Sequence, residues 1–105
     1  MDSYTLRPGD HATRTPGPRS LVTCVLATLS TIPTKYLTPD EQIDIARAGR
    51  VCGSVRTDSL AFAEQRGIVW GIASKFLPEN HYLGFHPVED SRFGVWPWDP
   101  DGEPI

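Results

Sequence analysis

Residues 80–102, NHYLGFHPVEDSRFGVWPWDPDG, contain two short aromatic and apolar runs separated by a polar segment. HYLGF (81–85) and FGVWPW (93–98) have the composition of β-strands, and residues 88–91, VEDS, are typical of a turn. We therefore expect an antiparallel hairpin. Such a hairpin would bring His81, at the start of one strand, and Asp99, after the end of the other, to the same end of a sheet.

Two further features of this half of the chain bear on the sheet. IVWGIA (68–73) follows Gly67 and is short, aromatic and β-branched, so it also predicts a strand. Pro97 has no N–H to donate to a neighbouring strand, which favours an edge position for the strand that contains it.

The residues before Gly67 predict three helices. SLVTCVLATLSTI (20–32) has apolar residues at helical spacing up to Pro33. Its β-branched residues make a buried strand the competing interpretation, but the run is long for a strand, which favours a helix.

The next two helices have cap signals. In LTPDEQIDIARAGR (37–50), Thr38 is a natural N-cap, Glu41 completes a capping box, and Gly49 is expected to end the helix. In TDSLAFAEQRG (57–67), Thr57 is expected to cap the helix and Gly67 to end it. Helices followed by strands predict an α+β domain, in which three helices precede a small antiparallel β-sheet and pack on one of its faces.

Length and composition fit one soluble domain. The chain has 105 residues, of which 39% are hydrophobic and 22% are charged. Residues 1–19 contain five Pro and Gly residues and no apolar periodicity, so we expect a flexible N-terminal arm that is ordered only where Tyr4 and Leu6 dock. Residues 20–105 are expected to form the domain.

Charge and cysteine content limit the partners and the compartment. The formal net charge of −3 argues against nucleic acid as the main partner, although the segment from Glu89 onward is acidic. No apolar run is long enough to span a bilayer and no leader follows Met1, so we expect a cytoplasmic protein without membrane contact. Cys24 and Cys52 are expected to be reduced thiols, and no zinc site is expected from them.

Cys24, His81 and Asp99 occur in an order that suits thiol chemistry. A thiol nucleophile needs a base within hydrogen-bond reach, and the base needs a third group to orient it. If Thr23 caps the first helix, Cys24 lies in the first turn, where the helix dipole lowers a thiol pKa. If the helix begins near Pro18, Cys24 is an inert core thiol. The sequence Asp-Pro-Asp-Gly also explains Asp99 as a turn residue.

Other residues have a structural and a functional interpretation. Cys52 is expected in a loop, as a plain residue more than a reactive thiol. His81 and His86 are five positions apart, so strand geometry places them on opposite faces and disfavours a metal site. Asn80 could supply an amide near a reacting oxygen. Core filling is the favoured interpretation of Trp70, Trp96 and Trp98, and a partner surface is the alternative.

Several motifs resemble papain-like cysteine enzymes, most closely the bacteriocin-processing peptidases and the transglutaminase-like core. NHYLGF (80–85) and VWPWDP (95–100) resemble the His-strand-turn-strand-Asp-Pro unit of that superfamily. PGPRSLVTCVL (16–26), TPDEQIDIARAGR (38–50) and TDSLAFAEQRGI (57–68) are similar to the three helices that precede it. The resemblance covers about residues 15–102. It implies a papain-like fold in the broad sense, but Pro16 stands where the bacteriocin-processing peptidases have their nucleophile.

Two hypotheses follow. The preferred one is a non-catalytic binding protein on a papain-like scaffold, which contacts a protein or peptide through Asn80, Trp96, Trp98 and the acidic end. The alternative is a thiol-dependent amide hydrolase or acyl transferase. In that case Cys24 would attack, His81 would act as base and then as acid, and Asp99 would orient the imidazole. Neither hypothesis includes a cofactor.

Overall fold

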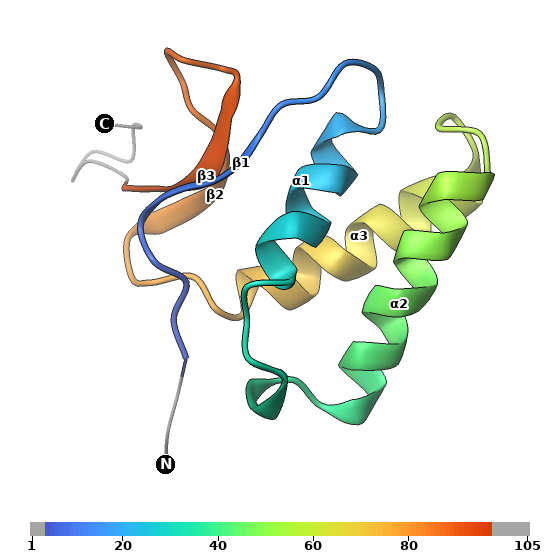
Figure 1. The fold of residues 1–105 in the computed structure, drawn as a ribbon, viewed down its shortest axis with the longest axis horizontal. Helices are drawn as coiled ribbons and strands as arrows, with labels where there is room; N and C mark the ends of the chain where they lie inside the picture. Colours follow the sequence, from blue (N-terminus) through green and yellow to red (C-terminus); the bar gives the residue numbers. More distant parts are fainter. Residues whose placement is uncertain (1–3, 98–105) are drawn as a thin grey trace.

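The computed structural model describes residues 4–97, in which three α-helices lie to one side of a small sheet (Figure 1). This arrangement confirms the α+β class. The elements in chain order are β1 (Gly9–Thr13), α1 (Ser20–Leu29), a 3-10 helix η1 (Thr34–Tyr36), α2 (Pro39–Ser54), α3 (Leu60–Ser74), β2 (His81–Phe85) and β3 (Arg92–Pro97). Within residues 4–97, none of the helices is both long and apolar enough to cross a bilayer.

The sheet is antiparallel, with strand order β1-β3-β2. The predicted hairpin of β2 and β3 is confirmed, with Leu83 opposite Val95 and Gly84 opposite Gly94. The edge position predicted for the second strand is wrong, because β3 is central. Pro97 is tolerated there because β1 pairs with β3 only as far as Val95, so no ladder hydrogen bond is lost where the proline N–H is missing.

The strand β1 was not predicted, and it lies in the segment expected to be a flexible arm. Its backbone pairs with β3, and the register shifts between Asp10 and Ala12, which leaves His11 as the extra residue of a bulge. The expected docking of Tyr4 and Leu6 is observed. Leu6 is fully buried and its N–H donates to the Phe76 carbonyl at 2.7 Å. The Tyr4 ring lies 5.2 Å from that of Tyr36.

Helix α2 begins as predicted and ends later. Thr38 and Glu41 form both hydrogen bonds of the capping box. The predicted end at Gly49 is wrong, because the helix continues to Ser54. The reason is burial: Cys52, beyond Gly49, belongs to the core. The Arg19 guanidinium donates to the carbonyls of Cys52 and Val55, which satisfies backbone acceptors at the end of the helix.

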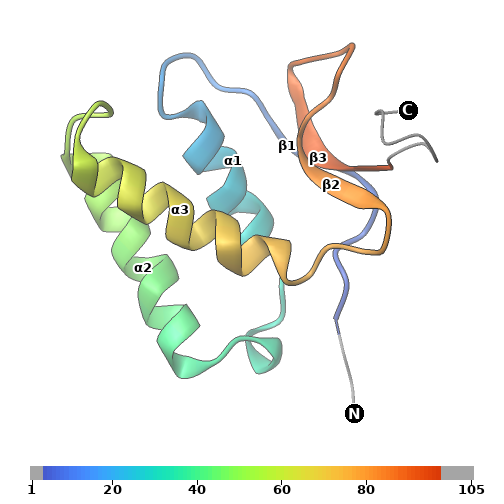
Figure 2. The same ribbon diagram turned by 180° about the vertical axis from the view of Figure 1, so that it is seen from behind.

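Helix α3 passes through the predicted break at Gly67. Residues 68–73 are helical and not a strand, because the buried positions among them, Val69, Ile72 and Ala73, follow helical spacing. Ser59, and not Thr57, is the N-cap; its hydroxyl accepts from the Phe62 N–H. In the views of Figures 1 and 2, α2 and α3 lie side by side, with α1 between them and the sheet.

One core connects the helices and the inner face of the sheet. Its members come from all three helices and from both hairpin strands. Thr28 of α1 is a fully buried polar residue, and its hydroxyl donates to the Cys24 carbonyl at 2.9 Å. The largest fully buried apolar side chains are Leu6, Val25, Leu29, Phe62, Val69, Phe93 and Val95.

We predict that Gly94→Ala destabilises the protein far more than Gly84→Ala. A Cβ at Gly94 would lie 2.0 Å from the Gly9 carbonyl oxygen, so β1 would have to move away from β3. A Cβ at Gly84 would lie 3.7 Å from the Tyr82 ring, which is an ordinary contact. Denaturant unfolding should show a loss of about 2–3 kcal/mol for Gly94→Ala, as for other overpacked sites. Equal losses for both variants would contradict the close approach of β1.

We predict that Glu41→Gln weakens folding only above the pKa of this carboxyl. Glu41 forms an ion pair with Lys75 of α3, and this hydrogen bond holds the pKa of Glu41 below its usual value. The stabilisation is therefore present above the ordinary pKa and is lost as the pH falls through the lowered one. Gln keeps the capping box. Since Lys75 is 59% exposed, unfolding at pH 7 should show a loss of under about 1 kcal/mol, and variant and wild type should converge in acid.

Candidate functional site

Cys24 lies inside α1 and not at its N-terminus. The N-cap is Arg19, so the interpretation of Thr23 as the cap does not hold. The Cys24 side chain is 1% exposed and its Sγ lies 3.5 Å from the Thr13 carbonyl oxygen of β1. Burial raises the pKa of the thiol above its usual value, although the Ser20 hydroxyl and Arg14 act in the opposite direction. This is the environment of a core thiol and not of an activated nucleophile.

His81 lies at the other end of the sheet. It begins β2 opposite Pro97, and its Nδ1 lies 2.8 Å from the Glu79 carbonyl oxygen. Cys24 contacts Thr13, which pairs with Arg92 at the opposite end of β3. At about 3.4 Å per residue, these two ends are about 17 Å apart. The structure therefore does not bring the thiol and the imidazole together, and Asp99 lies outside the described residues.

Asn80 and Cys52 have structural environments. Asn80 is exposed and has a φ of 61°, the left-handed conformation that turns the chain into β2. Cys52 is buried in α2 and not in the expected loop. Burial raises the pKa of its thiol, and the charges of Arg19 and Arg66 oppose this rise.

Trp96 is covered by its neighbours on the outer face of the sheet. The side chain is 6% exposed, and its Nε1 donates to the Gly84 carbonyl at 2.8 Å. The His86 ring meets the indole edge-on at a centroid distance of 4.8 Å, and the Arg92 guanidinium lies 5.1 Å from it. Trp96 thus presents little surface to a partner, and Trp98 lies outside the described residues.

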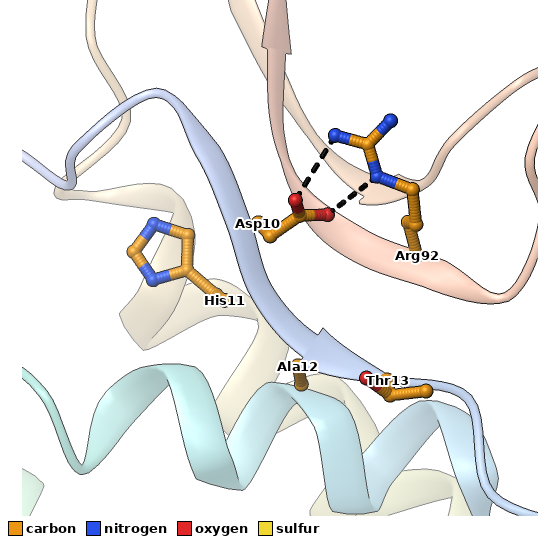
Figure 3. Close-up of a pocket in the computed structure, with 5 residues that line it drawn as sticks. All are labelled: Asp10, His11, Ala12, Thr13 and Arg92. Carbon is orange, nitrogen blue, oxygen red and sulfur yellow. Dashed lines mark hydrogen bonds and ion pairs between the residues drawn. The ribbon is translucent and has the colours of Figure 1, made fainter.

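A hollow of about 490 Å³ borders β1 and β3 and is shown in Figure 3. Asp10 and Arg92 face each other there and form two hydrogen bonds of 2.8 and 3.0 Å, whereas His11 points away. Arg92 also donates to Glu89. The hydrogen bond with Arg92 lowers the pKa of Asp10, and the contacts with Asp10 and Glu89 raise the pKa of Arg92. Asp10 and Arg92, the two residues of the hollow that carry full charges, are thus already paired with each other.

A second hollow, of about 240 Å³, lies between α1 and α3. We call it the α1–α3 hollow; it is lined by Leu21, Arg66, Gly67 and Trp70. Leu21 and Trp70 are partly buried and pack against the core. Sequence reasoning missed this site because it ended α3 at Gly67 and placed Trp70 in a strand. A helix continued through Gly67 would have placed Gly67 and Trp70 one turn apart on the same face.

A further apolar hollow, of about 270 Å³, lies near the end of α1. Its lining comes from α1, the segment around η1 and α2, and Gln42 donates there to the Leu37 carbonyl. Among residues 4–97, no group of three or more His, Cys, Asp or Glu side chains could hold a metal ion.

Comparison of the chain with protein-family models, with curated proteins and with solved structures finds no match.

We predict that neither thiol behaves as an activated nucleophile in the folded protein. Both are buried with raised pKa values, so alkylation by iodoacetamide at pH 7 should be much slower than in the unfolded chain and should rise only above about pH 8.5. Peptide mapping after labelling assigns each site, and protein unfolded in guanidinium is the control. Rapid labelling of Cys24 near pH 6 that disappears in His81→Ala would contradict the geometry.

Proposed function

We propose that this protein is a non-catalytic binding module, and that its α1–α3 hollow takes a bulky apolar side chain of a peptide that also carries a neighbouring carboxylate. The observation that carries the proposal is that one hollow is lined by an indole and by an arginine that has no counter-ion among residues 4–97. Trp and Arg are the residue types most enriched among residues that dominate binding energy.

The apolar part of the hollow is shaped by the absence of a side chain at Gly67. A Cβ added there would meet no atom within 4 Å, so the space at Gly67, in the hollow that Trp70 also lines, is open. Leu21 of α1 supplies the opposite wall. An apolar side chain inserted between them would remove apolar surface from water on both partners, at about 25 cal/mol per Å².

The charge of the hollow selects the partner. Among residues 4–97, no side chain forms an ion pair or hydrogen bond with the Arg66 guanidinium, in contrast to Arg92 and Arg56, which bind carboxylates. A guanidinium at the rim of an apolar hollow favours a carboxylate as its partner, because the pair forms charge-assisted hydrogen bonds. We therefore infer an acidic peptide and not a basic one.

Three other expectations from the sequence bear on this proposal: the scaffold, the enzyme alternative and a tryptophan contact surface. The papain-like scaffold stays a prediction, because the order of three helices and the His81 hairpin agrees with it but the strand β1 before the helices was not part of it. The alternative of a thiol-dependent enzyme has less support, because Cys24 is buried at the far end of β3 from His81. A contact surface at Trp96 and Trp98 stays a prediction, with little of Trp96 exposed.

The test uses short synthetic peptides in which a central Leu, Phe or Trp is flanked by Glu, Gln or Lys, titrated into the ¹⁵N-labelled full chain. We expect the Glu-flanked peptides to bind best, with shifts centred on Trp70. Gly67→Leu should fill the hollow and abolish binding, yet keep or raise stability by up to about 1 kcal/mol, because Leu is a better helix former than Gly. Arg66→Gln should remove the preference for Glu over Gln.

Gly49→Leu is the matched control. Gly49 is also a helix-interior glycine with no atom within 4 Å of an added Cβ, and it lies on α2 away from the hollow. This variant should gain similar stability and bind peptides as the wild type does. Absence of binding by every peptide, or binding that Gly67→Leu leaves unchanged, would overturn the proposal.

A further inference from the structure

The two edges of the sheet differ in how they are protected. Next to the β1 edge are Pro8, the bulge at His11 and the contact of Cys24 Sγ with the Thr13 carbonyl. These are devices that prevent another strand from adding to an edge. The β2 edge has none of them. Its residues, HYLGF, include no proline, no bulge and no Lys, Arg, Asp or Glu.

The hydrogen-bonding groups of β2 alternate between β3 and the open edge. The His86 N–H donates to the Arg92 carbonyl at 2.7 Å, so the even-numbered residues Tyr82 and Gly84 face β3. The N–H and C=O groups of Leu83 and Phe85 therefore point outward, and no described residue binds them. The His81 N–H donates to the Pro78 carbonyl at 3.3 Å, so at His81 only the C=O is available to a further strand. Figure 2 shows β2 in front of β3 and β1, with no described element over it.

We propose that β2 pairs with β2 of a second copy of this chain, antiparallel, about a two-fold axis at Leu83. In this register the two Leu83 residues exchange two hydrogen bonds, and each Phe85 N–H donates to the His81 carbonyl of the other copy. The outward-facing groups match those that an antiparallel partner needs. The result is a six-stranded sheet without exposed β2 edges.

The side chains are also self-complementary in this register. Tyr82 of each copy, whose ring lies beside Gly84 of its own strand, lies opposite Gly84 of the other copy, which has no side chain to oppose the ring. Aromatic cover of a glycine on the neighbouring strand is a known stabilising device in sheets. The self-pairing of Tyr82 with Gly84 favours a second copy over an unrelated strand, because HYLGF supplies both members of the pair.

The charges agree with the same register. The paired segments have no Lys, Arg, Asp or Glu, so the contact brings no like charges together. At the ends of the pairing, His86 of one copy comes level with Asn80 of the other and Glu79 with Pro87, so no carboxylate lies opposite another. Opposite or neutral groups at the rim favour association.

The test is the molar mass of the full chain, measured by light scattering after size exclusion. A dilution series starts at about 100 μM, because an interface formed by a single pair of short strands is weak. We expect twice the monomer mass of 11.6 kDa at the upper end. Gly84→Lys should restore the monomer mass, since it fills the space opposite Tyr82 and places two like-charged side chains at diagonal positions whose backbones are about 7–8 Å apart. A Cβ at Gly84 is compatible with the monomer, and circular dichroism checks its fold.

Val88→Lys is the control with the same charge change. Val88 is 84% exposed in the turn between β2 and β3, outside the pairing, so this variant should remain a dimer. In a mixed sample of labelled and unlabelled copies, isotope-filtered NOEs should connect Tyr82 of one copy with Gly84 of the other. A monomer mass throughout the series, a dimer that survives Gly84→Lys, or a dimer without these NOEs would overturn the proposal.

Discussion

The close approach of β1 to Gly94 of the central strand is the contact on which the rest of the structure depends. Position 94 has no room for a Cβ, because the Gly9 carbonyl occupies that space. The contact joins a segment near the N-terminus to the hairpin near the C-terminal end. It also closes the sheet over Phe93 and Val95, which are both fully buried. On the outer face, the bidentate pair of Asp10 and Arg92 ties together the same two strands.

This arrangement also decides the chemistry of the thiol. Helix α1 packs along β1, so the buried face of α1 directs Cys24 at the Thr13 carbonyl. His81 starts β2 at the opposite end of β3. The chain order of Cys, His and Asp therefore does not by itself assemble a catalytic site. The length of β3 separates Cys24 from His81. Between α1 and α3, in contrast, an indole and a guanidinium that forms no ion pair within residues 4–97 line one hollow.

The features that the sequence predicted correctly are stabilised by interactions between residues close together in the chain. The capping box of Thr38 and Glu41 satisfies backbone groups within one turn, and the hairpin needs only adjacent strands and a turn, so both were predicted correctly. Gly49 and Gly67 were expected to end helices. A glycine in a helix costs about 1 kcal/mol. Burial of a side chain such as Val69 contributes about 1.5–3 kcal/mol, so the helices continue wherever a buried face does.

Strand β1 and the order of the sheet could not be predicted in the same way. GDHAT has no apolar alternation, because its pairing relies on backbone groups of β3 more than 75 residues later and its bulge breaks the side-chain period. The sequence by itself determined the capped helix, the hairpin and the α+β class. Only the tertiary structure decided that β3 is central, that Cys24 and His81 lie apart, and that Leu21 of α1 shares a hollow with Arg66 and Trp70 of α3. These outcomes depend on which buried surfaces meet, and that is set by contacts between residues distant in the chain.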